Sequence, residues 1–343
     1  MMKRTKLYRT LALCAIAIAF TSAGANAQII SIDHTKVIGN DEKGGNCGAC
    51  HQKEIAAWKE TPHFRSLDKL KDGKAIADKL GLGRSYRKTG FCVECHSTAK
   101  GDDPQDLETI SGVSCESCHG PAADWIKIHN DYGTGNNRDT ETAEHKKMRH
   151  EAADRAGMIR KDRVYLIAKN CFSCHLVPNE ALVNTGGHKT SSDFELVAWS
   201  HGEVRHNYFL SDTNKDTTAE RKRILYVVGR VVDLEMSIAA AAKITERGHY
   251  RSAILNRIRN ATQNVDAILA AAKDNVPEIK AVMDSVARRE DESLALTAEM
   301  LTELPKKLSA AAQKFVENND GSKLGAIDSL LPKPEEYKGA VAP

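Results

Sequence analysis

The sequence has few aromatic residues, no strong excess of one charge and, beyond its first residues, no long apolar run. Phenylalanine, tryptophan and tyrosine make up 5% of the 343 residues, which is thin for a conventional core. The formal net charge of +3 includes four cations and no acid within residues 1–27, so the rest of the chain is near −1. A basic nucleic-acid-binding surface is therefore not indicated. We also expect no membrane span after residue 27, because a spanning helix needs about 20 apolar residues.

The N-terminus has the layout of a secretory signal peptide. Cationic residues precede an apolar run over residues 11–20, and Ala25-Asn26-Ala27 follows as an A-x-A cleavage site. Cys14 would suggest a lipoprotein anchor, but the bulky Leu13 before it and the short apolar stretch ahead of it argue against that alternative. We predict cleavage after Ala27, a periplasmic or secreted location, and a mature chain of one large domain or two ordinary ones.

The cysteines are the most informative feature of the chain. One of the nine lies in the signal peptide, and the other eight form four C-x-x-C pairs, each followed at once by histidine. The motifs are Cys47–Cys50–His51, Cys92–Cys95–His96, Cys115–Cys118–His119 and Cys171–Cys174–His175. This is the attachment signature of c-type haem, with the histidine as proximal iron ligand. Disulfides, zinc ribbons and thioredoxin-like sites also use C-x-x-C pairs, but none requires the histidine. We therefore predict four covalently bound haem c groups.

Nine of the thirteen histidines lie outside these motifs and are candidates for the second axial position of a haem. Two follow a motif closely: His63 lies 12 residues after His51, and His129 lies 10 residues after His119. On an unbroken helix His51 and His63 would be about 18 Å apart, so they could not bind one iron. We therefore predict that His63 and His129 each bind a neighbouring haem, which draws the haems into a cluster.

Three more histidines, His188, His201 and His206, follow the fourth motif. The glycines at 186 and 187 would let the backbone at His188 approach a porphyrin closely. His201 and His206 are five residues apart and would point in different directions on one helix, so only one of them is expected to bind iron. We predict His188 and His206 as the remaining ligands. The other histidines are expected to be solvated or hydrogen-bonded; they are His34, His145, His150 and His249.

Two stretches resemble the tetrahaem cytochrome c-554 family. One is Cys-Gly-Ala-Cys-His51 leading through Trp58-Lys-Glu-Thr-Pro-His63, and the other is Gly112-Val-Ser-Cys115-Glu-Ser-Cys-His119-Gly-Pro121 with His129 ten residues on. The resemblance covers roughly residues 44–210. It implies a largely helical fold with haems in closely stacked pairs, with His129 as distal ligand of haem 1 and His63 as distal ligand of haem 3.

The chain departs from this family at the second haem. The type member has no sixth ligand there, whereas this chain adds the Gly-Gly-His188 segment, which resembles distal-ligand segments of other multihaem cytochromes. With His63 and His129 used elsewhere, His188 and His206 are left for haems 2 and 4. The assignment stays open, with a preference for His188 on haem 2 and His206 on haem 4, and we expect the second haem to be six-coordinate.

From about residue 220 the composition shifts to Ala, Leu, Lys, Arg and Glu, with no cysteine. Apolar residues recur every three or four positions, as in Ile224, Val228, Val231, Leu234 and Ile238, which is typical of amphipathic helices. We predict a mostly α protein with a multihaem domain over residues 28–215, a helical bundle over 216–335 and a loose tail over 336–343. The bundle is expected either to dock partners or a second copy of the chain, or to cap haem edges, and to be dispensable for haem incorporation.

The function that these patterns favour is an exported carrier that relays electrons between redox partner proteins, without catalytic residues. One alternative is an enzyme that reduces or oxidises small nitrogen compounds at an open haem iron. Another is a subunit of an extracellular haem filament. The sequence shows no clean sign of an open iron with nearby proton donors, so we expect a carrier rather than an enzyme.

Overall fold

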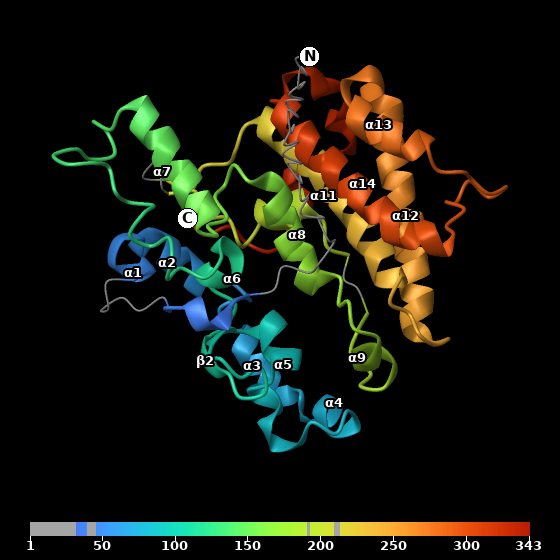
Figure 1. Ribbon diagram of the computed structural model, residues 1–343, viewed down its shortest axis with the longest axis horizontal. Helices are drawn as coiled ribbons and strands as arrows, with labels where there is room; N and C mark the ends of the chain where they lie inside the picture. Colours follow the sequence, from blue (N-terminus) through green and yellow to red (C-terminus); the bar gives the residue numbers. More distant parts are fainter. Residues whose placement is uncertain (1–31, 40–45, 191–192, 209–212) are drawn as a thin grey trace, which may run out of the picture.

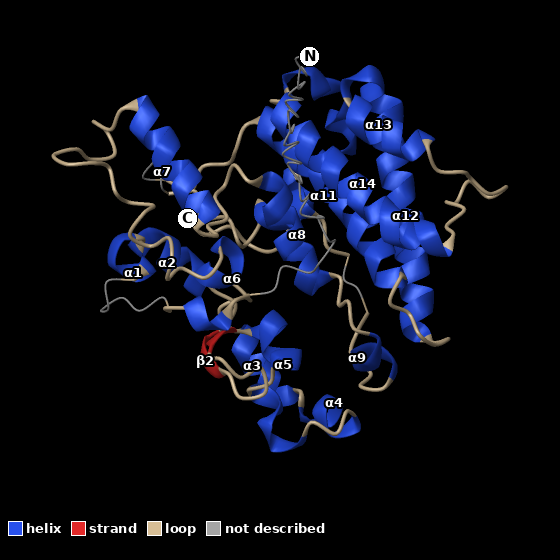
Figure 2. Cartoon of the chain, viewed as in Figure 1, coloured by secondary structure: helices blue, strands red, loops and turns tan. Residues whose placement is uncertain are grey.

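The computed structural model describes residues 32–39, 46–190, 193–208 and 213–343. The predicted signal peptide, residues 1–27, lies outside the described residues. Within the described ranges the chain is mostly helical, as predicted, with one two-stranded sheet (Figure 2). No helix in these ranges is long and apolar enough to cross a membrane.

Short helices make up the N-terminal half, and long helices make up the C-terminal half (Figure 1). The α-helices are α1 (Cys47–Cys50), α2 (Gln52–Lys59), α3 (Ser66–Asp72), α4 (Lys74–Lys79), α5 (Gly90–His96), α6 (Cys115–His119), α7 (Ala143–Arg155), α8 (Val164–His175), α9 (Glu180–Asn184), α10 (Leu196–Ser200), α11 (Ala219–Ala241), α12 (His249–Ala272), α13 (Pro277–Asp284) and α14 (Ala298–Asn318). The 3-10 helices are η1 (His34–Lys36), η2 (Gly83–Arg87), η3 (Lys273–Asn275), η4 (Ser322–Leu330) and η5 (Pro334–Glu336). The antiparallel strands are β1 (Thr98–Lys100) and β2 (Glu108–Ser111).

Each C-x-x-C-H motif coincides with a helix or with the end of one, namely α1, α5, α6 and α8. Residues three apart on a helix share a face, so the helical turn points both cysteines of a pair the same way. The chain turns sharply after α6, where Gly120 has a φ of +87°. This is a backbone conformation that glycine adopts readily, and it sends the chain on toward His129.

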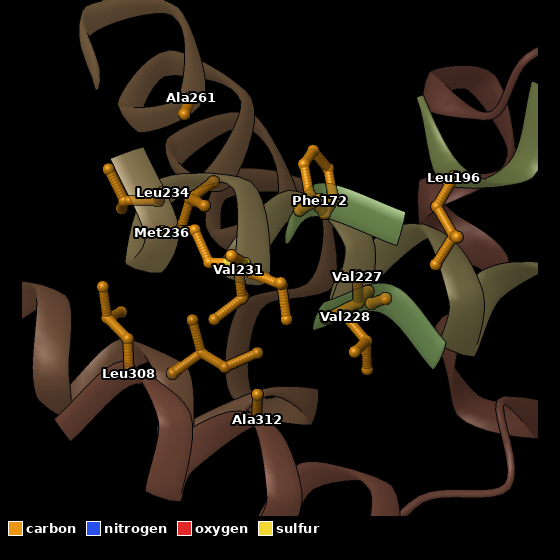
Figure 3. Packing of buried hydrophobic residues seen from close by; sticks show 14 of the residues in the cluster. Phe172, Leu196, Val227, Val228, Val231, Leu234, Met236, Ala261, Leu308 and Ala312 are labelled. Atoms are coloured by element: carbon orange, nitrogen blue, oxygen red, sulfur yellow. The ribbon is translucent and has the colours of Figure 1, made fainter. Parts of the chain in front are cut away.

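The main hydrophobic core surrounds α11 in the C-terminal half (Figure 3). This helix is buried on nearly all sides; Val227, Val228, Val231 and Leu234 have no exposed surface. Helices α12 and α14 pack along it, and so do α8 and α10. A helix that is buried on nearly all sides must be enclosed by other elements. The C-terminal bundle therefore uses α8, the helix with the fourth motif, as one of its walls.

The core consequently crosses the domain boundary expected at residues 215 and 216. Phe172 and Leu176 of the fourth-motif region and Leu196 of α10 belong to the same cluster of buried residues as α11. Removing α11 would therefore expose the apolar side of α8, and the expectation that the bundle is dispensable for haem incorporation stays a prediction. The local helical periodicity was visible in the sequence, but the surface that covers α11 was not.

Residues 336–343, expected from the sequence to be a loose tail, are hydrogen-bonded to an earlier part of the chain. The N–H of Lys338 donates to Ala198 O (2.9 Å), and the N–H of Glu203 donates to Lys338 O (2.7 Å). Gly202 permits this approach, since a Cβ at that position would lie 2.1 Å from Lys338 O. Further along, Asn214 Nδ2 donates to Ala342 O (2.9 Å). The tail is thus hydrogen-bonded to the part of the chain that carries His206.

Candidate functional site

One large cavity contains all the residues predicted to bind haem. Its volume is about 3780 Å³, several times the about 300–1,000 Å³ of an ordinary ligand pocket. All eight motif cysteines, all four motif histidines and the four predicted distal histidines line it. The scarcity of aromatic residues is consistent with this arrangement, because the N-terminal half encloses a cavity in place of a large core of its own.

Inside the cavity, each motif histidine faces a second histidine from elsewhere in the chain. The ring centres are 6.5 Å apart for His51 and His129, 6.3 Å for His96 and His188, 6.1 Å for His119 and His206, and 6.1 Å for His175 and His63. Each predicted distal residue therefore meets one motif histidine. Within the described residues no group of three or more metal-binding side chains converges, so the histidines meet only in twos.

This spacing fits two imidazoles on opposite sides of one iron. With metal–nitrogen bonds of about 2 Å and about 1 Å from each nitrogen to its ring centre, the centres would be about 6 Å apart. The four observed separations, 6.1 to 6.5 Å, lie at that value. Direct contact between two rings would bring them closer, as for His175 and Phe194, whose centres are 4.4 Å apart. The residues present therefore fit haem.

Hydrogen bonds at Nδ1 orient four of the eight rings. Nδ1 lies 2.6 Å from Ile126 O in His129, 2.9 Å from Ile159 O in His119, 2.8 Å from Lys189 O in His188 and 2.7 Å from Val204 O in His206. A carbonyl oxygen only accepts, so Nδ1 carries the proton and the lone pair is left on Nε2. Hydrogen bonds of this kind fix the tautomer and the orientation of a metal-binding histidine.

Burial keeps most of the paired histidines in the form that binds metal. It lowers the pKa of His63, His96, His119 and His129 below the ordinary value. It also lowers the pKa of His175 to about 4, with His63 adding to the effect. Because the neutral imidazole is the form that binds metal, burial in the cavity favours the protonation state that iron requires.

Contacts between motifs give their order along the cavity. Cys47 and Cys115 lie next to each other, and their interaction lowers the pKa of Cys47 and raises that of Cys115. The first and third motifs therefore adjoin. On α8, Asn170 Nδ2 donates to Ser117 O (2.7 Å) and Cys118 O (3.0 Å), so the third motif adjoins the fourth.

The fourth motif adjoins the second. Cys174 Sγ donates to Glu94 O (3.7 Å), and the neighbouring Cys174 thiol raises the pKa of Cys95. The order is therefore first, third, fourth, second, which differs from the order along the chain. The first and second motifs occupy the two ends.

Two pairings differ from those expected. His63, which the resemblance implied for haem 3, faces His175 of the fourth motif, and His206, preferred for haem 4, faces His119 of the third. The reason lies in the turn between α2 and α3, where the Ser66 hydroxyl lies within hydrogen-bond distance of both His63 O (2.6 Å) and His96 O (2.9 Å). This holds His63 beside the second motif, next to the fourth.

The other two pairings agree with the expectation, since His129 lies beside His51 and His188 beside His96. Their roles as iron ligands stay predictions. His201 does not face a motif histidine; its Nδ1 lies 3.0 Å from Val197 O and its Nε2 lies 3.8 Å from Asp216. Three of the remaining histidines are within hydrogen-bond distance of a polar group: His34 of Ala99 O, His145 of Glu141 and His150 of Arg160. His249 is the first residue of α12.

Sequence reasoning missed two kinds of supporting residue. Phe194 and Trp199 lie against the ring of His175, with centres 4.4 and 4.9 Å away. Two aromatic residues within 25 residues of the fourth motif, in a chain with few aromatic residues, are a weak signal that they pack beside its histidine. Glu116, inside the third motif, is 1% exposed. Its carboxylate accepts from the N–H groups of Gly39 (2.7 Å) and Ala122 (2.8 Å), and nothing in the sequence distinguishes it from a surface acid.

Comparison with known proteins agrees with the composition of the cavity. Residues 46–120, which contain the first three motifs, match the family described as cytochrome c554 and c-prime. Residues 46–120 form a cytochrome c554 family domain. This family implies covalent haem c and, at the family level, electron transfer.

A curated relative, cytochrome c-554 of Nitrosomonas europaea, is 28% identical over 142 residues. The match covers 38% of this chain and 55% of the relative, so the chain spans about half the length of the curated relative it matches. No solved structure matches the chain. The fourth motif and the helices from α11 onward lie beyond the cytochrome c554 domain at residues 46–120.

Proposed function

We propose that this chain is an electron carrier with four haem c groups, each bound by two histidines. The observation that carries the proposal is the set of four histidine pairs, each joining one motif histidine to one distal histidine at 6.1 to 6.5 Å. Haem c supplies a one-electron iron couple when bound. The cytochrome c554 domain supports the cofactor type, and the fourth C-x-x-C-H motif supports the count.

The chain's own residues would hold and tune the cofactor. The two cysteines of each motif would anchor it covalently, and the paired histidines would hold the iron. Indole and phenyl rings pack beside these histidines, as Trp125 does at His129 with ring centres 5.3 Å apart. Trp125 Nε1 is buried without a protein acceptor among the described residues and lines the cavity, so it can donate to a group held there.

Histidine on both sides of every iron favours a relay over catalysis. An enzyme acting on a small nitrogen compound needs an open coordination position, and each of the four motif histidines has a second histidine opposite it. The motif order first, third, fourth, second gives a linear path with two ends. We therefore propose that electrons pass between redox proteins that meet the chain at these ends.

We also propose that the chain works outside the cytoplasm. Residues 1–27 have the charged, apolar and A-x-A regions of a signal peptide, and Ala27 is the last residue before the proposed cleavage point. N-terminal sequencing of the haem-loaded protein should begin at Gln28. A chain that begins at Met1 or Met2 would contradict export by cleavage.

Optical and paramagnetic resonance spectra of the oxidised protein test the proposed function. The expected result is four low-spin irons per chain, with no high-spin signal and no carbon monoxide binding after reduction. The intact mass should exceed that of residues 28–343 by four haems. A stoichiometric high-spin iron that binds carbon monoxide or nitric oxide would favour the catalytic alternative, and a mass with three haems or fewer would refute the count.

A further inference from the structure

Six buried polar side-chain atoms have no hydrogen-bond partner within the described residues. They are His34 Nε2, Trp125 Nε1, Glu195 Oε1, Arg205 Nε, Arg230 Nε and Glu278 Oε2. Two of the six, Trp125 Nε1 and Arg205 Nε, belong to residues that line the large cavity, and both are N–H donors. A buried donor without an acceptor is costly, so each of these atoms calls for an acceptor that the protein itself does not supply.

Trp125 lies beside the predicted distal ligand of the first motif. It is 4% exposed, and its ring centre is 5.3 Å from that of His129, with the two ring planes at 88°. The N–H of His129 also donates to Trp125 O (3.0 Å), so one turn of the chain fixes both residues. An indole N–H can only donate. Trp125 therefore offers one hydrogen bond to an acceptor held next to the pair formed by His51 and His129.

Arg205 has the corresponding place at the third motif. It precedes His206, whose ring faces that of His119, and its side chain is 16% exposed. Asp216 Oδ1 lies 3.7 Å from Arg205 Nη1, which is beyond hydrogen-bond distance, and the same carboxylate is 2.5 Å from Lys222 Nζ. Asp216 therefore leaves the buried Nε of Arg205 unbonded.

Comparable side chains elsewhere on the cavity wall have protein partners. Trp58 lines the cavity, but its Nε1 donates to Val113 O (2.8 Å). Arg160 lines the cavity as well, and its Nε pairs with Asp154 (2.7 Å). The missing acceptors at residues 125 and 205 are thus particular to those two positions, and are not a general property of indole and guanidinium groups on this wall.

The chemistry of the two donors indicates what they would hold. Haem c carries two propionate carboxylates, at the edge of the ring opposite the edge that the cysteines attach. A carboxylate accepts from an indole N–H, and it forms charge-assisted hydrogen bonds with a guanidinium. A positive charge near the iron also favours reduction, because reduction adds an electron.

We propose that Trp125 and Arg205 are carboxylate subsites that hold propionates of the first-motif and third-motif haems, and that Arg205 raises the reduction potential of the third-motif haem. This rests on the proposed function, which assigns one haem to each histidine pair. Both residues belong to the segments that carry the distal histidines, so the same stretch of chain would supply an axial ligand and a partner for the ring edge.

Matched substitutions in the fully haem-loaded protein test the proposal. Arg205→Gln removes the charge, Arg205→Lys keeps it, and Lys215→Gln removes a charge from an exposed residue that also lines the cavity. Trp125→Phe removes the indole N–H and keeps an aromatic ring, and Trp58→Phe removes an N–H that Val113 O accepts. Spectroelectrochemical titration measures the four reduction potentials, and resonance Raman spectra follow the propionate bending bands.

Two further variants assign the potentials to haems. His206→Ala should remove the third-motif haem from the low-spin titration, and His129→Ala should remove the first-motif haem. The potential that is missing from the low-spin titration of each variant identifies the haem concerned.

Arg205→Gln should lower the equilibrium constant for reduction of the third-motif haem about tenfold, which is about 59 mV for one electron. Arg205→Lys should recover more than half of that shift. Lys215→Gln should change the constant less than about twofold, because solvent screens an exposed charge. Trp125→Phe should lower the constant of the first-motif haem about threefold and shift a propionate band, whereas Trp58→Phe should do neither.

An unchanged potential and propionate band in Arg205→Gln or in Trp125→Phe would overturn the subsite of that residue. Equal shifts in Arg205→Gln and Lys215→Gln would overturn the subsite at Arg205, since they would reflect the charge of the segment and not a held carboxylate. In each case a high-spin iron in His206→Ala and in His129→Ala would leave the proposed function standing. Low-spin iron throughout in both histidine variants would overturn the histidine pairs, and the subsites with them.

Discussion

The ring of His63 lies 6.1 Å from the ring of His175, although one belongs to the turn after α2 and the other ends α8. Ser66 fixes this relationship from one side through its hydroxyl, and Phe194 fixes it from the other by stacking on His175 with ring centres 4.4 Å apart. The pair joins the N-terminal half of the cavity to the wall of the C-terminal bundle. This histidine pair is therefore complete only when the two halves of the chain pack together.

Substitution of His63 should remove one distal ligand and leave every haem attached. Attachment depends on the cysteines, so His63→Ala should keep four haems by mass and convert one iron of the oxidised protein to the high-spin state. The paramagnetic resonance spectrum counts that iron, and carbon monoxide should bind it stoichiometrically after reduction. His249→Ala, at an exposed position of α12, is the control and should leave the spectrum unchanged. An unchanged spectrum in His63→Ala would contradict the distal role.

Gly112 should be required for the position of His63. A Cβ at Gly112 would lie 2.3 Å from His63 O and 2.4 Å from Phe64 O, closer than atoms can pack. Gly112→Ala should push the turn away, lower the free energy of unfolding by about 1–3 kcal/mol, and produce a partial high-spin signal. Gly325→Ala, where the nearest side-chain atom would be 3.7 Å away, should have neither effect. A thermal melt and the resonance spectrum measure the two consequences, and a normal spectrum in Gly112→Ala would show that the turn can shift without losing the ligand.

The sequence predicted the motif residues and the helical fold because both are local patterns. Four C-x-x-C-H motifs and the stripe that includes Val228 and Leu234 can be recognised without knowing what they touch. The pairing of His63 with His175 could not be predicted in this way, because it depends on how short helices without a large core of their own pack around a cavity. The same limit applies to the tail, whose bonds to Ala198 and Glu203 join backbone groups, which carry no sequence signal.

Acid should weaken the first-motif end through Glu141. Its side chain is 1% exposed and pairs with Arg149 (2.6 Å), which also donates to the backbone carbonyl of His129. The hydrogen bond from Arg149 lowers the pKa of Glu141 from 4.5 to about 2. Because the folded pKa is depressed, this stabilisation is fully present above the unfolded value and is lost as pH falls through the folded one.

The corresponding experiment compares melting temperatures of the unmodified protein and Glu141→Gln between about pH 2 and pH 6. The variant should melt at a lower temperature by a constant amount above about pH 4.5, and the difference should shrink toward zero as pH approaches about 2. Glu144→Gln, at an exposed position of α7, controls for loss of one acid. A difference that is independent of pH over this range would show that the charge of Glu141 is not what stabilises the fold.

Removal of the tail should disturb the third-motif pair rather than only an exposed end of the chain. Residues 198–208 carry His206 opposite His119, and Lys338 binds this segment through its N–H and its carbonyl, at 2.9 and 2.7 Å. A variant that ends after residue 335 should retain four haems and the helical content of the α11 bundle, but one iron should become high-spin or mixed-spin in the resonance spectrum. Lys338→Ala is the first control, since it removes the ammonium that lies over Trp199 and keeps both backbone bonds.

Gly202→Ala gives the same test without shortening the chain. The Cβ of the new alanine would lie 2.1 Å from Lys338 O. The tail would therefore have to move away from residues 198–208, although all of its residues would still be present. Both Gly202→Ala and the shortened variant should show the high-spin signal, and Lys338→Ala should not. Low-spin iron throughout in the shortened variant would mean that Val204 O, which lies 2.7 Å from His206 Nδ1, orients the ring without help from the tail. The tail would then be a surface covering and not a positioning element for His206.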